Sequence, residues 1–284
     1  MAAESNTRVA FQGERGAFSE EAATKLLGEN IALVPRPTFE AAFHAIGDGL
    51  ADYVLAPIEN SLAGSVHRSF DLLVESRLNI VAEVIIPIVH NLIGAPSARF
   101  EGIAVVESHP VALAQCERFF SAHPRLKRIA TEDTAGSVRE IVRAGDRTRA
   151  AIAGRRAAHI YGGVILREHL EDNRENYTRF LLLSASSDPL GDADKLSLVF
   201  QLGHKPGALV CSLEPISRRN INLLKIESRP VHGSPWQYRF YLDLQASKSD
   251  PEVAAALAEM EKLAVNLRIL GSYPSAEGPD DKKS

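Results

Sequence analysis

The chain has 284 residues and a net charge of -4, with 45% hydrophobic and 24% charged residues. This composition is typical of a folded globular protein with one large domain or several smaller ones. It excludes the strongly basic footprint of a nucleic-acid-binding domain. The longest apolar runs, such as residues 79–87, are too short to cross a membrane.

The ends of the chain and its cysteines indicate a cytoplasmic protein. Residues 1–7 are polar and carry no secretory signal, and both 1–7 and 275–284 are expected to be flexible. The chain has only two cysteines, Cys116 and Cys211. This count argues against a disulfide framework and favours a reducing compartment, where each is interpreted as a small buried side chain.

No cofactor is expected from the sequence. The nine histidines do not cluster and are interpreted as structural or solvated, and no paired Cys/His spacing indicates a metal site. The Gly13 to Gly16 turn does not complete a nucleotide-binding loop. The Arg155-Arg156 pair is interpreted as part of a solvated helix face.

The first 183 residues alternate between β-prone apolar runs and helical patterns, which predicts an α/β fold with parallel sheets. The runs 80–86 and 89–93 are expected to cross from one sheet to another. Strands are predicted at 9–11, 31–34, 53–58, 80–86, 89–93, 103–106, 129–130, 150–153 and 177–183. Helices are predicted with caps at Ser19, Thr38 and Asp133 or Thr134, through Leu113, Cys116 and Phe119, and over 155–161.

A Ser-, Asp- and Gly-rich segment, 184–194, is predicted to be a linker. After it come strands at 196–202, 221–227, 238–244 and 265–270, with helices opening at Pro206 and over 251–263. This βαββαβ order predicts a ferredoxin-like domain.

Polar clusters follow several predicted strands, at 13–19, 59–61, 108–110 and 133–134. In open α/β sheets ligands bind beyond the carboxyl ends of strands, and helix N-termini there bind anions. The recurrence predicts a small anionic ligand between two α/β lobes. Each cluster alone is better explained by helix capping.

Five segments resemble motifs of the prephenate dehydratase family. They read G-x-x-G-x-x-S at 13–19, P-I-E-N-S at 57–61, S-x-P-x-A-L-x-Q-C at 108–116, D-T-A at 133–135 and E-N-Y-T-R-F at 175–180, which ends in T-R-F at 178–180. Asp133 stands where the family has Ser. The resemblance covers nearly the whole chain from Val9 onward.

The resemblance implies a two-lobed catalytic domain over 8–184, similar to periplasmic binding proteins, with prephenate in the interlobe cleft and no cofactor. Thr178 would donate to the leaving hydroxyl, unless burial makes Glu59 the proton source. Arg179 would pair with a substrate carboxylate, and Phe180 would pack beside it. The other substrate contacts would be Gly16, Asn60, Ser61, Ser108, Thr134 and Ala135.

Two later segments resemble those of phenylalanine-sensing ACT domains, here over 195–272. They are G-A-L-V, which is Gly207, Ala208, Leu209 and Val210, and E-S-R-P, which is Glu227, Ser228, Arg229 and Pro230. The resemblance implies that L-phenylalanine is an effector. It also implies a homodimer or homotetramer.

Other functions stay open. Arogenate dehydratases carry the same motifs, so the sequence does not separate the two substrates. A non-catalytic amino-acid-binding regulator is a third possibility, against which Glu59-Asn60-Ser61 and Thr178-Arg179-Phe180 count. No fused mutase domain is expected before Val9.

Overall fold

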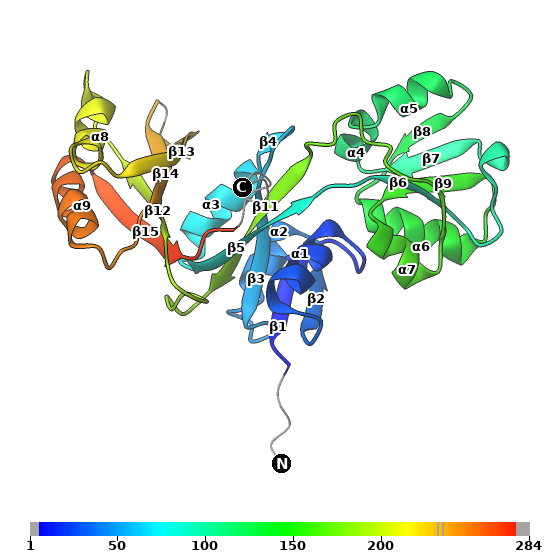
Figure 1. Ribbon diagram of the computed structural model, residues 1–284, viewed down its shortest axis with the longest axis horizontal. Helices are drawn as coiled ribbons and strands as arrows, with labels where there is room; N and C mark the ends of the chain where they lie inside the picture. The colour runs from blue at the N-terminus through cyan, green and yellow to red at the C-terminus, as the bar shows by residue number, and fades with distance from the viewer. Residues whose placement is uncertain (1–5, 232, 235, 277–284) are drawn as a thin grey trace, which may run out of the picture. The chain divides into compact units, whose positions relative to one another are not determined.

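The computed structural model describes residues 6–231, 233–234 and 236–276 (Figure 1). Its internal contacts divide it into a first unit, the chain up to Ser76 with Val84–Leu181, and a second unit, Arg77–Glu83 with the chain from Leu182. The division passes through strands β5 (Asn79–Pro87) and β11 (Tyr177–Ser184). Each of these strands therefore has its two ends in different units.

The first sheet has the order β2-β1-β3-β11-β5, with β4 paired to β3. Its other strands and its helices are β1 (Arg8–Gln12), β2 (Ala32–Arg36), β3 (Tyr53–Asn60), β4 (Gly64–Ser65), α1 (Phe18–Leu27), α2 (Phe39–His44) and α3 (His67–Glu75). Strand β1 is parallel to β2 and β3, as predicted. Its residues Val9, Ala10 and Phe11 are completely buried.

Two helix starts in this part test the predicted caps. Thr38 caps α2, because its side chain accepts a hydrogen bond from the backbone of Ala41. Ser19 is not a cap, since α1 begins directly after Ala17. The Ser19 hydroxyl instead donates to the carbonyl of Gln12. Strand β4 and helix α3 were not predicted.

The second sheet has the order β10-β6-β9-β7-β8. Its elements are β6 (Asn91–Gly94), β7 (Val105–Ser108), β8 (Lys127–Ala130), β9 (Arg149–Ala153), β10 (Val164–Arg167), α4 (Pro110–Ala114), α5 (Glu117–Ala122), α6 (Thr134–Ala144), α7 (Arg155–Tyr161) and the 3-10 turn Phe100–Gly102. Strand β7 is parallel to β8 and β9, as predicted. The prediction is wrong for β6, which is antiparallel to β9 and β10, so this sheet is mixed. Strand β10 was not predicted.

The single helix predicted through Leu113, Cys116 and Phe119 is wrong. The chain forms α4 and then α5, and it breaks at Cys116. The break has a physical cause, because the first backbone N–H groups of α5, at Glu117 and Arg118, bind the carboxylate of Asp172. This distant cap starts a new helix.

The predicted crossing between sheets is confirmed. The chain leaves the first sheet through β5, builds the second sheet from β6 to β10, and returns through β11. Within the first unit we call the layer around the first sheet the first lobe and the layer around the second sheet the second lobe. This is the two-lobed arrangement that the resemblance implies.

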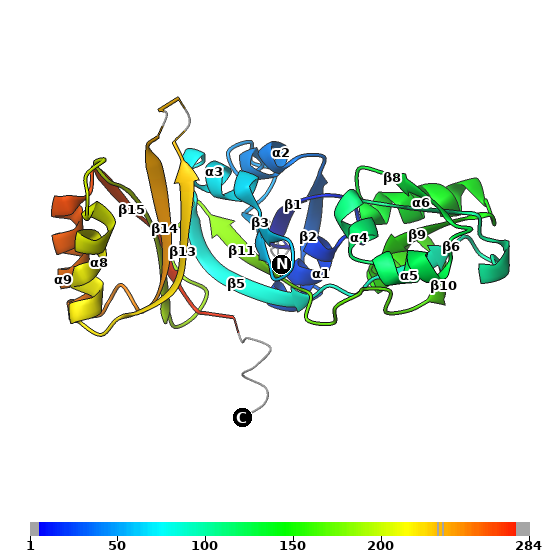
Figure 2. The same ribbon diagram turned by 90° about the horizontal axis from the view of Figure 1, so that it is seen from above.

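The second unit carries the predicted ferredoxin-like arrangement. Its elements are β12 (Lys195–Gln201), α8 (Ala208–Arg218), β13 (Asn222–Pro230), β14 (Tyr238–Gln245), α9 (Pro251–Leu263) and β15 (Asn266–Tyr273). The sheet order is β13-β14-β12-β15, and α8 and α9 cover one face of it (Figure 2).

Two expectations about this unit are wrong. Helix α8 begins after Gly207 rather than at Pro206, because Gly207 holds a left-handed conformation with φ of +76°. Cys211 is exposed, whereas Cys116 is buried as expected. Burial raises the pKa of the Cys116 thiol, which keeps it protonated.

Candidate active site

Asn60 and Thr178 come together where β3 ends beside β11. The side-chain amide of Asn60 donates to Thr178 Oγ1 at 3.0 Å, to the carbonyl of Tyr177 at 3.0 Å and to Asn176 Oδ1 at 2.7 Å. Its carbonyl oxygen accepts from the backbone N–H groups of Leu62 and Ala63. Strand β3 runs two residues further than predicted, through Glu59 and Asn60, and this extension places Asn60 against β11.

Ser61 joins the same two strands. Its hydroxyl donates to the carbonyl of Glu175 at 2.7 Å and accepts from the backbone of Tyr177 at 2.9 Å. Its own backbone N–H donates to the Tyr177 carbonyl. In this structure Ser61 therefore fixes the start of β11, the strand that carries Thr178.

Strand geometry places the other candidate residues of β3 and β11 on different faces of their strands. Neighbouring side chains on a strand point to opposite faces, so Arg179 lies on the other face of β11 from Thr178 and Phe180. Thr178 is 8% exposed and Phe180 is 2% exposed, whereas Arg179 is half-buried. The same alternation along β3 directs Glu59 away from the face of Asn60.

The second-lobe candidates lie at the C-terminal end of β7 and at the start of α6. Ser108 is completely buried, and its hydroxyl donates to the carbonyl of Ile152 at 2.6 Å. Ala135 is also completely buried and packs in the core of this lobe. Thr134 is the first residue of α6, where the side chain of Asp133 accepts from Gly136 and is the cap. Donation by Ser108 to a substrate would require its present bond to break.

Three further polar residues extend the Asn60–Thr178 pair. Asn176, which is 1% exposed, donates to Gln115 Oε1 at 3.0 Å. His90, which is 2% exposed, places Nε2 at 2.8 Å from the same oxygen. Gln115 and Asn176 stand inside the family motifs, so the sequence carried a signal for them. His90 stands in an apolar run with no such signal.

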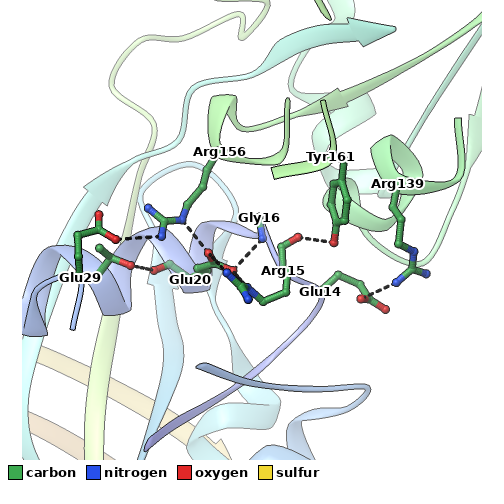
Figure 3. A network of polar contacts seen from close by, with 9 residues as sticks. Glu14, Arg15, Gly16, Glu20, Glu29, Arg139, Arg156 and Tyr161 are labelled. Carbon is green, nitrogen blue, oxygen red and sulfur yellow. Dashed lines mark hydrogen bonds and ion pairs between the residues drawn. The ribbon is translucent and has the colours of Figure 1, made fainter. Parts of the chain in front are cut away.

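A second polar network joins the two lobes through the Gly13 to Ser19 loop (Figure 3). The completely buried carboxylate of Glu20 accepts from Gly16 N at 2.9 Å, from Arg15 Nε at 2.8 Å and from Arg156 Nε on α7 at 2.8 Å. Tyr161 of the same helix donates its hydroxyl to the Arg15 carbonyl. The interpretation of Arg156 as a solvated side chain is therefore wrong.

Gly16 is needed for this contact between the lobes. Its φ is +83°, and a Cβ at this position would lie 2.8 Å from Cα of Ala157. No other residue fits without a shift of α7. The observed role of Gly16 is thus close approach of two backbones.

The cavity beside this network does not suit an anionic substrate. It has a volume of about 820 Å³, and none of Asn60, Ser61, Ser108 or Thr178 lines it. Its arginines are paired with carboxylates: Arg15 and Arg156 with Glu20, and Arg155 with Glu168. The paired charges leave little net attraction for an anion.

The second unit brings part of the other predicted site together. Ala208 and Leu209 line a cavity of about 150 Å³ together with Leu202, Gly203, His204, Lys205, Trp236, Gln237, Tyr238 and Phe240. Gly207 precedes them in its left-handed conformation, and Val210 is 73% exposed. Glu227, Ser228, Arg229 and Pro230 form the end of the edge strand β13.

Among the described residues, no helix is long and apolar enough to cross a membrane. In the same part of the chain, no group of three His, Cys, Asp or Glu side chains is placed to hold a metal ion.

Comparisons with known proteins place the chain in a family. Residues 9–188 match the family model for prephenate dehydratase. The chain is 42% identical over 287 residues to arogenate dehydratase/prephenate dehydratase 1 of Arabidopsis thaliana, covering 95% of this chain and 73% of that protein.

Two solved structures are similar over nearly the whole chain. Prephenate dehydratase from Arthrobacter aurescens in complex with L-Phe is 30% identical with a TM-score of 0.86, covering 97% of this chain and 94% of that one. A quorum-quenching acylase is 32% identical with a TM-score of 0.86, covering 96% and 98%. From the family model and these relatives, the chain belongs to the prephenate dehydratase family, a family of carbon–oxygen lyases.

Proposed function

We propose that this chain converts prephenate to phenylpyruvate. The bond between the ring and its carboxylate breaks, and carbon dioxide leaves while the electron pair enters the ring. The ring C–O bond then breaks, and the hydroxyl takes one proton and leaves as water. Aromatisation supplies the driving force, so the protein needs to hold a dianion and deliver one proton.

The hydrogen bond from Asn60 to Thr178 carries this proposal. Because the amide of Asn60 donates to the lone pair of Thr178 Oγ1, the hydroxyl proton of Thr178 stays available for the leaving oxygen. A donor on its oxygen also makes the threonine a stronger acid. Glu59 points to the other face of its strand. This favours Thr178 as the group that meets the leaving hydroxyl.

The substrate carboxylates have two proposed partners. Thr134 and Ala135 begin α6, where the first backbone N–H groups of a helix have no partner within the helix and can bind an anion. The guanidinium of Arg179 is the second candidate, although strand alternation separates it from Thr178. The kinetics of Arg179→Lys decide which of the two binds.

A turnover assay with prephenate tests the reaction. The purified chain should form phenylpyruvate after exhaustive chelation and without added cofactor. Thr178→Val, which keeps the side-chain shape and removes the hydroxyl, is the matched control and should be nearly inactive. An inactive parent, or a parent that needs a metal, contradicts the proposal.

Arogenate is the alternative substrate, because the Arabidopsis relative is named for both activities. Arogenate carries an amino group where prephenate has a ketone. The ratio of kcat/KM for the two substrates, measured side by side, decides between them. An N-acyl substrate in the same series tests the activity named for the similar acylase structure.

The second unit is proposed to be an ACT domain that binds L-phenylalanine and inhibits the reaction. The cavity at Ala208 and Leu209 supports this role, because its apolar and aromatic lining suits a phenyl ring. The glycine before it leaves room for a ligand to approach the backbone of α8. The similar Arthrobacter structure is described as a complex with L-Phe.

A homodimer or homotetramer is proposed, formed through the edge strand β13. Leu224 and Ile226 of this strand are 46% and 43% exposed. An exposed apolar edge strand is prone to pair with another chain. Sedimentation analysis with and without phenylalanine tests the assembly. Cytoplasmic location stays a prediction, which fractionation of cells would check.

A further inference from the structure

We infer that His90 is a positioning residue of the active site, which holds Gln115 with its Nε2–H and so orients the hydrogen-bond chain that ends at Thr178. The inference rests on the proposed function for its kinetic consequence. Its structural part, the protonation of one particular ring nitrogen, stands independently. His90 lies between β5 and β6, where the chain crosses to the second lobe.

The direction of the chain is set by backbone groups, which leave no choice of amide orientation. Leu62 and Ala63 donate N–H groups to one side of the Asn60 amide, so that side is the oxygen. The other side is therefore the NH₂ group, and it also faces the carbonyl of Tyr177.

Each following amide is oriented by the one before it. The Asn60 NH₂ group meets Asn176 at 2.7 Å, so the atom of Asn176 that it meets is the oxygen. The NH₂ group of Asn176 then faces Gln115, which must present its own oxygen at 3.0 Å. His90 Nε2 lies 2.8 Å from that oxygen and can only donate to it.

The surroundings of His90 fit a fixed neutral ring with its proton on Nε2. The ring is 2% exposed, and Nδ1 has no hydrogen-bond partner among the described residues. The Phe18 ring packs against it in a T-shaped arrangement, with centroids 5.8 Å apart. Burial lowers the pKa of His90 more than the bond to Gln115 raises it, which favours the neutral form.

The backbone of His90 is also held in place. Its N–H donates to Glu171 Oε2 at 2.8 Å, and its carbonyl accepts from Leu170. A fixed backbone and a packed ring are what a donor needs in order to orient a partner. Without this donor, Gln115 loses one of the two hydrogen bonds to its oxygen, and Asn176 is left bound to an acceptor that is less firmly held.

The kinetic test compares His90→Leu with His90→Gln. Glutamine places an NH₂ donor near the position of Nε2, whereas leucine fills the space without a donor. We expect His90→Leu to lower kcat by roughly 10- to 100-fold with little change in KM, because a misplaced donor acts on the reacting geometry. His90→Gln should recover most of the lost kcat.

His123→Leu is the matched control. His123 is a second-lobe histidine that bonds a backbone carbonyl and packs against Phe100 and Phe119, outside the chain to Thr178. It should leave kcat unchanged. A folded His90→Leu variant with the kcat of the parent overturns the inference, and so does an equal loss in His123→Leu.

A spectroscopic test needs no activity. Nitrogen NMR of the parent labelled at histidine, with the His90 signals assigned by their absence from His90→Leu, should find the His90 ring protonated at Nε2 only, with that proton slow to exchange. A His90 ring protonated at Nδ1, or at both nitrogens at neutral pH, overturns the inference. If the parent fails to convert prephenate but this signal is present, the proposed function fails while the assigned hydrogen bond stands.

Discussion

The side-chain amide of Asn60 donates a hydrogen bond to Thr178 Oγ1 across 3.0 Å, and these residues stand 118 positions apart in the sequence. The pair exists because β3 and β11 are neighbours in the first sheet, although the whole second sheet lies between them in the chain. A donor fixed on the oxygen of Thr178 leaves the threonine proton aimed at another partner. This is the arrangement that proton donation to a leaving hydroxyl requires.

Thr178→Ala should lower kcat by about 10²- to 10⁴-fold, the usual contribution of a positioned proton donor. KM should change far less, because the hydroxyl acts mainly as the C–O bond breaks. Thr178→Ser should retain part of the activity. Steady-state kinetics with prephenate measures both effects. An alanine variant with normal turnover would make Thr178 an ordinary strand residue.

Asn60→Asp should also be nearly inactive while staying folded. Aspartate keeps the acceptor for Leu62 and Ala63 and so preserves the turn after β3. Its second oxygen, however, would face the Asn176 oxygen and the Tyr177 carbonyl, where the NH₂ group now donates. Activity and thermal melting measured together separate these effects. A large fall in kcat with a small fall in melting temperature is expected.

Arg179→Lys tests the proposed carboxylate partner. Lysine keeps the charge but loses the planar fork that binds two oxygens. If Arg179 binds the substrate, KM should rise with little change in kcat. Kinetics equal to those of the parent would assign the carboxylates to the N-terminus of α6 instead, in agreement with the face that Arg179 occupies on β11.

Local patterns predicted most of the strands, because alternation of apolar runs and helical periodicity is a property of neighbouring residues. The extent of β3 was underestimated, since polar residues such as Glu59 and Asn60 carry no strand signal. Their strand conformation comes from pairing with β4 and contact with β11. The split of α4 from α5 likewise depends on Asp172, a cap that no local pattern contains.

The contacts between the lobes could not be predicted from local sequence patterns either. Glu20 has the sequence features of a helix-dipole acid, and nothing near it indicates a partner 136 residues away. Arg156 has the features of a solvated side chain. The family motifs identified Asn60 and Thr178, and they contain Gln115 and Asn176. His90 lies outside them and is recognised only from its place in the hydrogen-bond chain.

Glu20→Gln should destabilise the folded chain at neutral pH. Burial raises the pKa of Glu20, but hydrogen bonds from Arg15, Arg156 and Gly16 outweigh it and hold the pKa below the ordinary value of 4.5. The variant weakens charged hydrogen bonds to two arginines, a loss of about 1–3 kcal/mol. Denaturant unfolding of parent and variant at pH 7 measures it.

The pH dependence of this difference has a definite sign. Because the folded pKa of Glu20 is lowered, its contribution is present above the unfolded value and is lost as pH falls through the folded value. The difference in unfolding free energy between the parent and Glu20→Gln should therefore become smaller below about pH 4.5. Glu140→Gln, at an exposed pair with Arg143, is the control and should show a much smaller effect. A difference in unfolding free energy that grows as the pH falls would contradict the lowered pKa of Glu20.

Gly207→Val should weaken inhibition by phenylalanine while sparing turnover. Gly207 has φ of +76°, which a β-branched residue adopts only with strain, so the first turn of α8 beside Ala208 and Leu209 must shift. Gly49→Val introduces the same strain at φ of +69°, where an added Cβ meets nothing within 4 Å. It should leave inhibition unchanged.

A point variant is preferable to truncation, because Lys195 of this unit pairs with the buried Glu83. The measurements are a phenylalanine titration of activity and calorimetric binding, since inhibition requires the ligand to favour one conformation. A parent that neither binds phenylalanine nor responds to it would leave this unit only a role in assembly.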